Sequence, residues 1–248
     1  PIERFTYRAA GINHLTWFTD MKIDGKDVYP KLHDKLKESG FDKKEPISKQ
    51  LYDIYGLYPA PGDRHVGEFF PYYMKEEVLM EQDYEWKNND FKVVDGWREE
   101  ARVLFDEVRT KKEGYEEFLK GSGETATYFI RSLATGDISD EMVNVINNGY
   151  IDNVSSGIIV ELPTYIDEFG LHPQKIGKLP DAIAAQCDRL GREYLLMVEA
   201  AATCNYELAR QAMFLDPLVS NCKYPELLLK DLIRANLDLL PEAWEKHC

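Results

Sequence analysis

The stretch that decides the fold is AAGINHLTWFT, residues 9–19. It places an amide and an imidazole inside a run of apolar, β-prone residues, and the pattern predicts that residues 5–23 are extended. Burying an unpaired polar side chain costs about 1–3 kcal/mol, so Asn13 and His14 need partners. A metal ion, a substrate or a neighbouring segment could supply them, and the spacing alone favours a histidine that is hydrogen-bonded inside the core.

Length and composition indicate a globular chain of one large or two small domains. Of its 248 residues, 44% are apolar and 30% are charged, which is ordinary for such proteins. No stretch approaches the roughly 18 apolar residues of a membrane span, so we expect no membrane partner. The first four residues, Pro1 to Arg4, contain no apolar segment of the kind that a signal peptide needs, and we expect a cytoplasmic location.

Charge and cysteine usage exclude further classes of protein. The 30 basic and 44 acidic residues give a net charge of −14, which repels a phosphate backbone, so nucleic acid is not an expected partner. The cysteines are far apart and form no C-x-x-C pair, which argues against a disulfide framework or a zinc ribbon. They are Cys187, Cys204, Cys222 and Cys248.

The periodicity of apolar residues predicts an α+β fold that is mostly helical, with a small and mainly antiparallel sheet. A turn at residues 24–27 should fold the first extended run back on itself, and strands are expected at 142–146 and 158–162 around a turn at 147–150. A loop begins at residues 59–63, which are rich in Pro and Gly. Helices are predicted over residues 30–39, 46–58, 97–119, 124–135, 206–214 and 225–240, and from Pro180 along a stripe that ends at Val198.

Several well-known signatures are absent from the sequence. No G-x-G-x-x-G fingerprint opens a strand–turn–helix unit, so no dinucleotide-binding half can be identified. There is also no G-x-S-x-G, H-E-x-x-H or P-loop motif. The sequence therefore does not predict an active site that is complete by itself.

Short elements in order along residues 9–219 resemble glycoside hydrolase family 4, and they match the carboxy-terminal half of its enzymes. The first is Gly11-Ile12-Asn13-His14. The others are residues 25–30 (GKDVYP), 147–153 (NNGYIDN), 160–163 (VELP), 170–173 (GLHP), 176–180 (IGKLP) and 215–219 (LDPLV). Residues 62–71 (GDRHVGEFFP) most resemble the α-galacturonidase and α-glucuronidase branch.

The resemblance implies that residues 1–248 form a carboxy-terminal substrate and metal domain, similar in fold to that of lactate and malate dehydrogenases. The family's Rossmann half, with its cysteine-asparagine-x-proline metal loop, is not found, so the chain would be truncated or paired with a separate Rossmann subunit. The implied cofactors are NAD, bound mainly by that other half, and Mn²⁺. This chain alone would be inactive.

The implied reaction is hydrolysis of O-glycosyl bonds, with α-uronides or α-galactosides as the expected substrates. It follows an oxidation–elimination route instead of two-carboxylate hydrolysis. NAD takes a hydride from C3 of the sugar, a base removes the C2 proton, the C1 substituent leaves, water adds and the ketone is reduced again. The metal ion acts as a Lewis acid at the C2 and C3 oxygens.

The resemblance also implies roles for individual residues. It makes His14 a metal ligand, since neutral imidazole suits Mn²⁺ and its neighbours. For the base, Asp63 is the first candidate and Tyr58 the second, although Asp63 could equally be a turn-former after Gly62. A base must come within about 2.6–3.2 Å of the proton it removes.

Four further residues are expected to bind substrate. Asn13 could contact a sugar hydroxyl or cap the backbone. Arg64 could grip a uronate carboxylate in bidentate fashion, or it could be an ordinary surface arginine. His65 is a substrate ligand or a local hydrogen-bonding residue, and Asn148 approaches the sugar through a tight turn or merely forms a hairpin turn.

Two other classes of function compete with the glycosidase hypothesis. The chain could be a non-catalytic remnant that binds sugar or serves in assembly. It could also be the catalytic domain of an oxidoreductase like lactate or malate dehydrogenase, but no catalytic histidine with an aspartate partner is evident for that class. The expected partners are a small sugar or uronide and further copies of the chain. The aromatic residues Phe69, Phe70, Tyr72 and Tyr73 suit a core or an oligomer interface.

Overall fold

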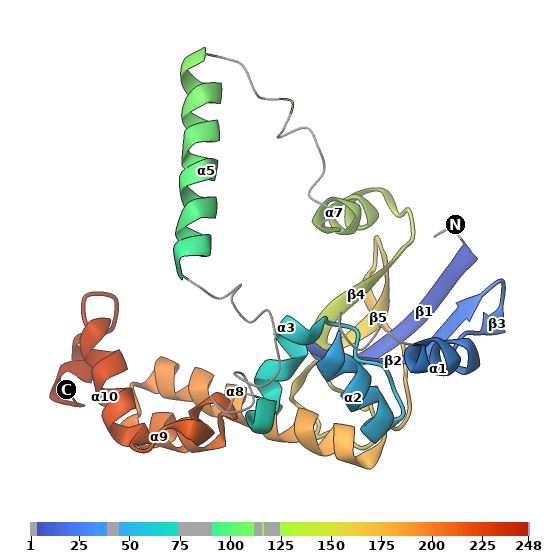
Figure 1. Cartoon of the computed structure of the whole chain (residues 1–248). Helices are drawn as coiled ribbons and strands as arrows, with labels where there is room; N and C mark the ends of the chain where they lie inside the picture. The colour runs from blue at the N-terminus through green and yellow to red at the C-terminus, as the bar shows by residue number, and fades with distance from the viewer. Residues whose placement is uncertain (1–3, 39–44, 74–90, 112–115, 117–124, 248) are drawn as a thin grey trace.

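The computed structural model describes residues 4–38, 45–73, 91–111, 116 and 125–247 (Figure 1). Every strand pair in this part of the chain is antiparallel, and the sheet order is β3-β2-β1-β5-β4, with β6 on β5. The α+β prediction is therefore confirmed. The strands are β1 (Phe5–Ile12), β2 (Leu15–Ile23), β3 (Lys26–Asp27), β4 (Ser139–Ile146), β5 (Ile159–Asp167) and β6 (Gly170–Pro173).

The first extended run is two strands and not one. β1 and β2 pair from Phe5–Ile23 to Ile12–Leu15, with one register shift between Arg8 and Ala9, and the chain reverses at Asn13 and His14. The prediction that these two side chains lie inside an apolar strand is wrong, because the tight turn puts both of them at an exposed tip. The predicted turn at residues 24–27 is confirmed. The chain reverses at residues 24 and 25, and β3 begins directly after them.

The predicted helices are present within the described residues, with shifted ends. α2 ends at Tyr55, because Gly56 takes φ 75° and closes it. The predicted helix at 97–119 begins earlier, and of its continuation past Lys111 only residue 116 is described. The helices are α1 (Tyr29–Lys37), α2 (Pro46–Tyr55), α3 (Asp63–Val66), α5 (Phe91–Lys111), α7 (Ala126–Thr135), α8 (Asp181–Thr203), α9 (Tyr206–Leu215) and α10 (Pro225–Ala235), with short 3₁₀ turns η2 (Gly67–Phe69), η3 (Pro71–Tyr73), η5 (Leu218–Asn221) and η6 (Glu242–His247).

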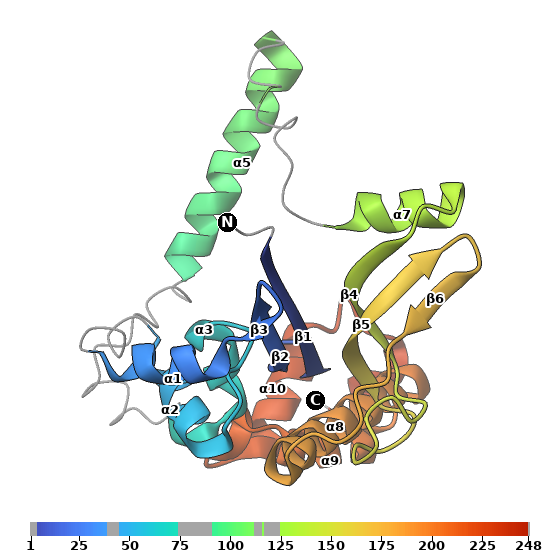
Figure 2. The ribbon, with the colours of Figure 1, turned by 90° about the vertical axis from the view of Figure 1, so that its right-hand side faces the viewer.

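The main core lies between the sheet, α2 and α8. Figure 2 shows α1, α2 and α3 beside the β1–β2 hairpin, with β4, β5 and β6 on the other side and α8 beneath. Fully buried side chains from each element meet there, among them Trp17 of β2, Leu51 of α2 and Leu190 of α8. A Cβ on Gly191 would lie 2.0 Å from Ile158 Cγ2, so glycine is what allows α8 to approach so closely.

The connection from β4 to β5 is organised by one buried amide. Asn147 is fully buried, and its Nδ2 donates to the carbonyl oxygens of Ile151, Val154 and Ser155 at 3.2, 2.7 and 3.3 Å. Its Oδ1 accepts from the backbone N–H groups of Tyr150 and Ile151, both at 3.1 Å. The side chain thus replaces the backbone partners that an irregular loop lacks.

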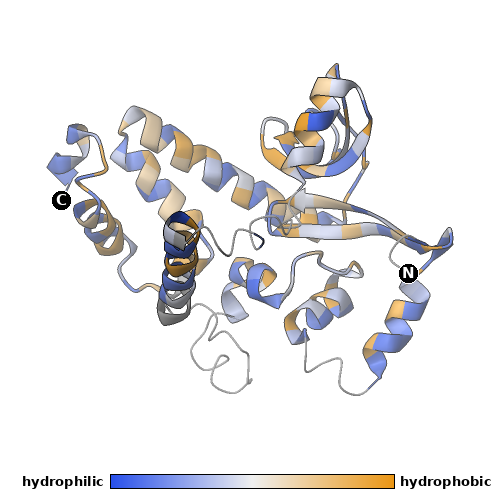
Figure 3. Cartoon of the chain, turned by 90° about the horizontal axis from the view of Figure 1, so that it is seen from above, coloured by the Kyte–Doolittle hydropathy of each residue, from blue (hydrophilic) through white to orange (hydrophobic). Residues whose placement is uncertain are grey.

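α5 stands apart from the sheet in both views (Figures 1 and 2). Coloured by hydropathy it is mixed (Figure 3), and it exposes large apolar side chains such as Trp97 and Phe105. No helix in the described part of the chain is both long and apolar enough to cross a membrane.

A buried carboxyl group lies on α8. Glu193 is 2% exposed, and its Oε2 atom has no hydrogen-bond partner among the residues that the structure describes. Burial and, to a smaller extent, the nearby Asp216 carboxylate raise the pKa of Glu193 to about 7, with Arg189 opposing both effects. Glu193 is therefore protonated over part of the range in which an exposed glutamate is ionised.

Asn147→Ala should lower the free energy of unfolding by about 2–4 kcal/mol, because it leaves several buried backbone groups without partners. Asn148→Ala is the matched control, since Asn148 is exposed in the same turn, and its cost should stay below about 0.5 kcal/mol. Urea unfolding of both variants measures the difference, and equal costs would contradict this role for Asn147.

Glu193→Gln should stabilise the protein at pH 8. The folded state keeps the Glu193 proton up to a pKa of about 7, against 4.5 for an ordinary glutamate. The unfolded state loses that proton first, so stability falls as pH rises from about 4.5 to beyond 7. The variant should remove most of this loss, about 1–3 kcal/mol. Thermal unfolding from pH 4.5 to 8 measures it, with exposed Glu199→Gln as control; parallel curves for parent and E193Q would contradict the account.

Candidate functional site

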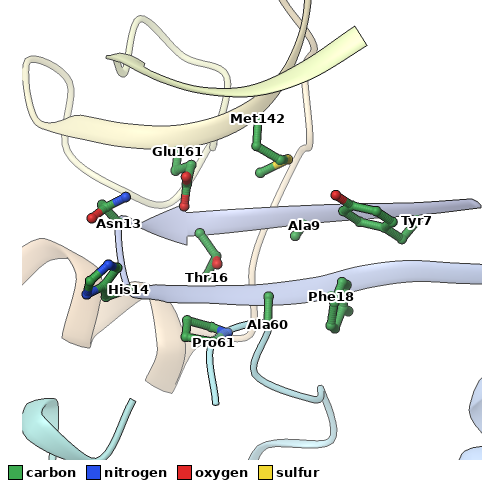
Figure 4. A pocket seen from close by; sticks show the side chains of 10 residues that line it. All are labelled: Tyr7, Ala9, Asn13, His14, Thr16, Phe18, Ala60, Pro61, Met142 and Glu161. Carbon is green, nitrogen blue, oxygen red and sulfur yellow. The ribbon is translucent and has the colours of Figure 1, made fainter. Parts of the chain in front are cut away.

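A cavity of about 390 Å³ opens at the tip of the β1–β2 hairpin (Figure 4). Its walls come from both hairpin strands, from the segment after α2, and from β4 and β5. The lining residues are Tyr7, Ala9, Asn13, His14, Thr16, Phe18, Ala60, Pro61, Met142 and Glu161. Of the residues predicted to form the site, this cavity brings together Asn13 and His14.

His14 occupies the turn in a left-handed conformation, with φ 63°. The residue is exposed, which excludes the alternative that His14 is hydrogen-bonded inside the core. A side chain at the apex of a tight turn is held by the backbone of two strands, so its position is fixed although it faces solvent. His14 is therefore available to a ligand.

Glu161 is the carboxylate of the cavity, and sequence reasoning did not assign it a role. It accepts a hydrogen bond from the Asn13 side chain, and Figure 4 shows the two side chains together. Burial raises the pKa of Glu161, while the Asn13 hydrogen bond and the His14 charge lower it. The available signal was a carboxylate inside the apolar run Ile158 to Leu162.

The position of Glu161 depends on Gly11. These two residues are the pair through which β1 meets β5. Gly11 has φ +154°, and a Cβ there would lie 2.3 Å from the carbonyl oxygen of Leu15. A residue with a side chain at position 11 would push the hairpin turn out of shape and separate His14 from Glu161.

Backbone hydrogen bonds hold the segment after α2 against β2. The Phe18 N–H donates to the Tyr58 carbonyl at 3.0 Å, and the Ala60 N–H donates to the Thr16 carbonyl at 2.9 Å. The chain then enters α3, whose Val66 is fully buried. This path brings His65 to His14, with ring centroids 4.3 Å apart.

The environment of His65 favours a neutral imidazole. Partial burial lowers its pKa, the neighbouring His14 lowers it further and Arg64 adds to this, whereas Glu68 acts in the opposite direction. A neutral imidazole keeps one lone pair free to bind a metal ion or accept a hydrogen bond.

Asp63 has a structural role in this geometry. Its Oδ2 and Oδ1 accept from the backbone N–H groups of Ile47 and Ser48 at 2.8 and 2.7 Å, which caps the start of α2. Its own N–H donates to Glu45 at 2.8 Å. Both carboxylate oxygens are thus engaged away from the cavity lining. These contacts favour the structural alternative, and Asp63 as base stays a prediction without a supporting contact.

The other predicted residues are not among those that line the cavity. Burial raises the pKa of Tyr58 to about 12, and Glu45 and Asp63 add to the effect, so this phenol resists ionisation. The Arg64 guanidinium lies 6.0 Å from the ring centroid of Trp97. Asn148 is exposed in the turn after β4. Substrate contacts by Arg64, His65 and Asn148 therefore stay predictions.

The donors at the hairpin tip suit a divalent transition-metal ion. Two imidazoles lie side by side at His14 and His65, and the carboxylate of Glu161 is close enough to His14 for their charges to interact. Within the described ranges no three His, Cys, Asp or Glu side chains converge as a full ligand set. A metal ion bound here would therefore need further ligands from substrate, solvent or another polypeptide segment.

Residues 9–219 match the model of the Family 4 glycosyl hydrolase C-terminal domain. The chain therefore belongs to family 4 of the glycosyl hydrolases, as its short elements predicted. An alpha-galactosidase of Bacillus subtilis (strain 168) is 30% identical to it, over 95% of this chain and 55% of that protein. An alpha-galacturonidase of Thermoanaerobacterium saccharolyticum is 31% identical, over 99% of this chain and 56% of that protein.

Solved structures share the fold. A 6-phospho-alpha-glucosidase from gut microorganisms, in complex with NAD and glucose-6-phosphate, has a TM-score of 0.77 at 26% identity and covers 98% of this chain. A 6-phospho-beta glucosidase from Thermotoga maritima, with manganese, NAD+ and glucose-6-phosphate, has a TM-score of 0.73 at 24% identity, over 97% of this chain, and shows the fold alone. In both cases the match covers 56% of the solved chain. The chain spans about half the length of the proteins it matches.

Proposed function

We propose that this chain is the sugar- and metal-binding part of a glycosidase that hydrolyses α-galactosides or α-uronides by NAD-dependent oxidation and elimination. The observation that carries the proposal is the cavity at the hairpin tip, where exposed His14 and half-buried Glu161 lie together in a family 4 C-terminal domain. The choice of substrate class rests on the alpha-galactosidase and alpha-galacturonidase at 30–31% identity.

His14 would hold a manganese ion or a related divalent ion. When bound, such an ion supplies Lewis-acid polarisation of sugar hydroxyl and ketone oxygens. The exposed tip of the turn suits this role, because the imidazole is fixed by the backbone and still reaches solvent. Asn13 would orient the sugar with part of its amide while the rest stays bonded to Glu161.

Glu161 is our candidate for the group that moves the C2 proton. It is the carboxylate that lines the cavity, and its burial raises its pKa toward the range in which a carboxylate both accepts and returns a proton. Asp63 was the first candidate from the sequence, but its oxygens serve the start of α2. Glu161 fits the proton-transfer role better on geometry.

NAD supplies hydride transfer at C3 when bound, and we assign its site to a nucleotide-binding part beyond these residues, in the same polypeptide or in a separate subunit. The sequence offers no G-x-G-x-x-G element of its own. Arg64 would favour uronides by pairing with their carboxylate.

A cytoplasmic location and a homo-oligomeric assembly belong to the same proposal.

Glu161→Gln should slow the exchange of the substrate C2 hydrogen with solvent deuterium by at least about 10²-fold, because the variant lacks the proton acceptor. The measurement is proton NMR of a 4-nitrophenyl α-galactoside or α-galacturonide in D₂O, using the NAD- and Mn²⁺-loaded enzyme that contains this chain. Asp63→Asn is the comparison variant, because Asp63 is the other candidate base. It should lower the melting temperature and keep far more of the exchange than Glu161→Gln does.

Three outcomes would contradict the proposal. If folded Asp63→Asn loses the exchange while Glu161→Gln keeps it, the base is Asp63, as the sequence first predicted. Turnover that continues without NAD excludes the redox route. If sugar binds but neither turnover nor exchange occurs with both cofactors and the nucleotide-binding part present, the chain is a non-catalytic binding module.

A further inference from the structure

We infer that His65 is a second metal ligand supplied by this chain, so that His14 and His65 together form a two-imidazole site for a divalent transition-metal ion. The inference rests on the proposed function insofar as it places the ion at His14. It goes further by giving His65 a role that competes with the substrate contact predicted from the sequence.

The two rings are arranged as a pair of ligands would be. Their centroids are 4.3 Å apart, and their planes are tilted by 47°, so the rings are not stacked flat on each other. An imidazole nitrogen binds a transition metal at about 2.0–2.1 Å. Nitrogens on two rings this close can both reach one ion with small side-chain rotations.

Both imidazoles are carried by anchored backbone, so their proximity is built into the fold. His14 sits between paired strands. His65 follows a segment that is bonded to β2 through Tyr58 and Ala60, and the next residue, Val66, is fully buried. A site held in this way loses little conformational freedom when it binds an ion.

α3 itself is tied down at its start by Asp63. The Asp63 carboxylate bonds to the N-terminus of α2, and the His65 and Val66 N–H groups donate to the Gly62 carbonyl at 2.9 and 3.1 Å. This gives a reason for the Asp63 contacts in a functional loop: they fix the short helix that presents His65. Asp63 is then a positioning residue for the metal site.

The test is direct metal binding, which needs no turnover. Isothermal titration of the chain with NiCl₂ should show one site, since nickel binds imidazole more tightly than manganese does. His14→Ala and His65→Ala should each weaken it at least about tenfold. His172→Ala is the matched control, because His172 is an exposed histidine on β6 paired with Asp167 at 2.8 Å, and it should bind nickel like the parent.

The spectrum of bound Cu²⁺ gives the number of histidine ligands independently of the nickel titration. The Cu²⁺ electron paramagnetic resonance spectrum of the parent should show two coupled nitrogens, and each single variant should show one. A structural role for His65 would change the melting temperature and not the nitrogen count.

The remaining results overturn the inference in distinguishable ways. If His14→Ala loses nickel and His65→Ala keeps it, His65 is not a ligand and the metal role of His14 survives. If neither variant weakens binding, the ion lies elsewhere and the assignment of His14 fails as well. If the parent chain binds no nickel, these two imidazoles do not form a site in this chain.

Discussion

The structure depends on the close backbone approach at Gly11. β1 meets β2 on one side and β5 on the other, and the register pair with β5 is Gly11–Glu161. The space for a Cβ is filled there by the Leu15 carbonyl, at 2.3 Å. Since Asn13 and His14 follow within three residues, the same glycine that lets the β1–β2 turn close also pairs with Glu161 and sets its carboxylate beside the turn. Fold and candidate site therefore share one constraint.

The part of the site that α3 contributes is positioned by contacts between segments far apart in the sequence. Residues 58–60 bond to β2, and the Asp63 carboxylate bonds to the start of α2. These contacts convert a Pro- and Gly-containing loop into a fixed support for α3. The result is a cavity edge where His65 faces His14 at 4.3 Å between ring centroids, although the two residues are far apart in the sequence.

Sequence reasoning predicted the elements whose apolar pattern is regular. α8 follows its stripe, and β4 and β5 flank a turn as expected. It failed at Asn13-His14, because β-prone residues continue on both sides and neither of the two turn residues is Gly or Pro. Asparagine and histidine tolerate the left-handed conformation more readily than most residues do, and that tolerance, together with Gly11 two residues earlier, is the local sign of the turn.

The sequence predicted only part of the candidate site, because local patterns do not show which distant residues meet. His14 and Asn13 were predicted as site residues because the short elements around them resemble those of family 4, and both line the cavity. Glu161 could not be assigned from its strand alone, since its place beside the turn arises from pairing with Gly11. Asp63 was predicted to be the base because a carboxylate can accept a proton. In the structure its oxygens accept hydrogen bonds from the backbone N–H groups of Ile47 and Ser48. Side-chain chemistry is readable in a sequence, whereas long-range partners are not.

The central claim is that the hairpin tip and α3 form one metal-binding edge of the cavity. Titrating the ¹⁵N-labelled chain with MnCl₂ and recording backbone amide spectra tests it most directly, because the paramagnetic ion broadens signals according to distance. The account predicts that the amides around Asn13, His14, His65 and Glu161 broaden first and together. Broadening centred on another part of the chain, such as Cys204 and Cys222, would contradict it.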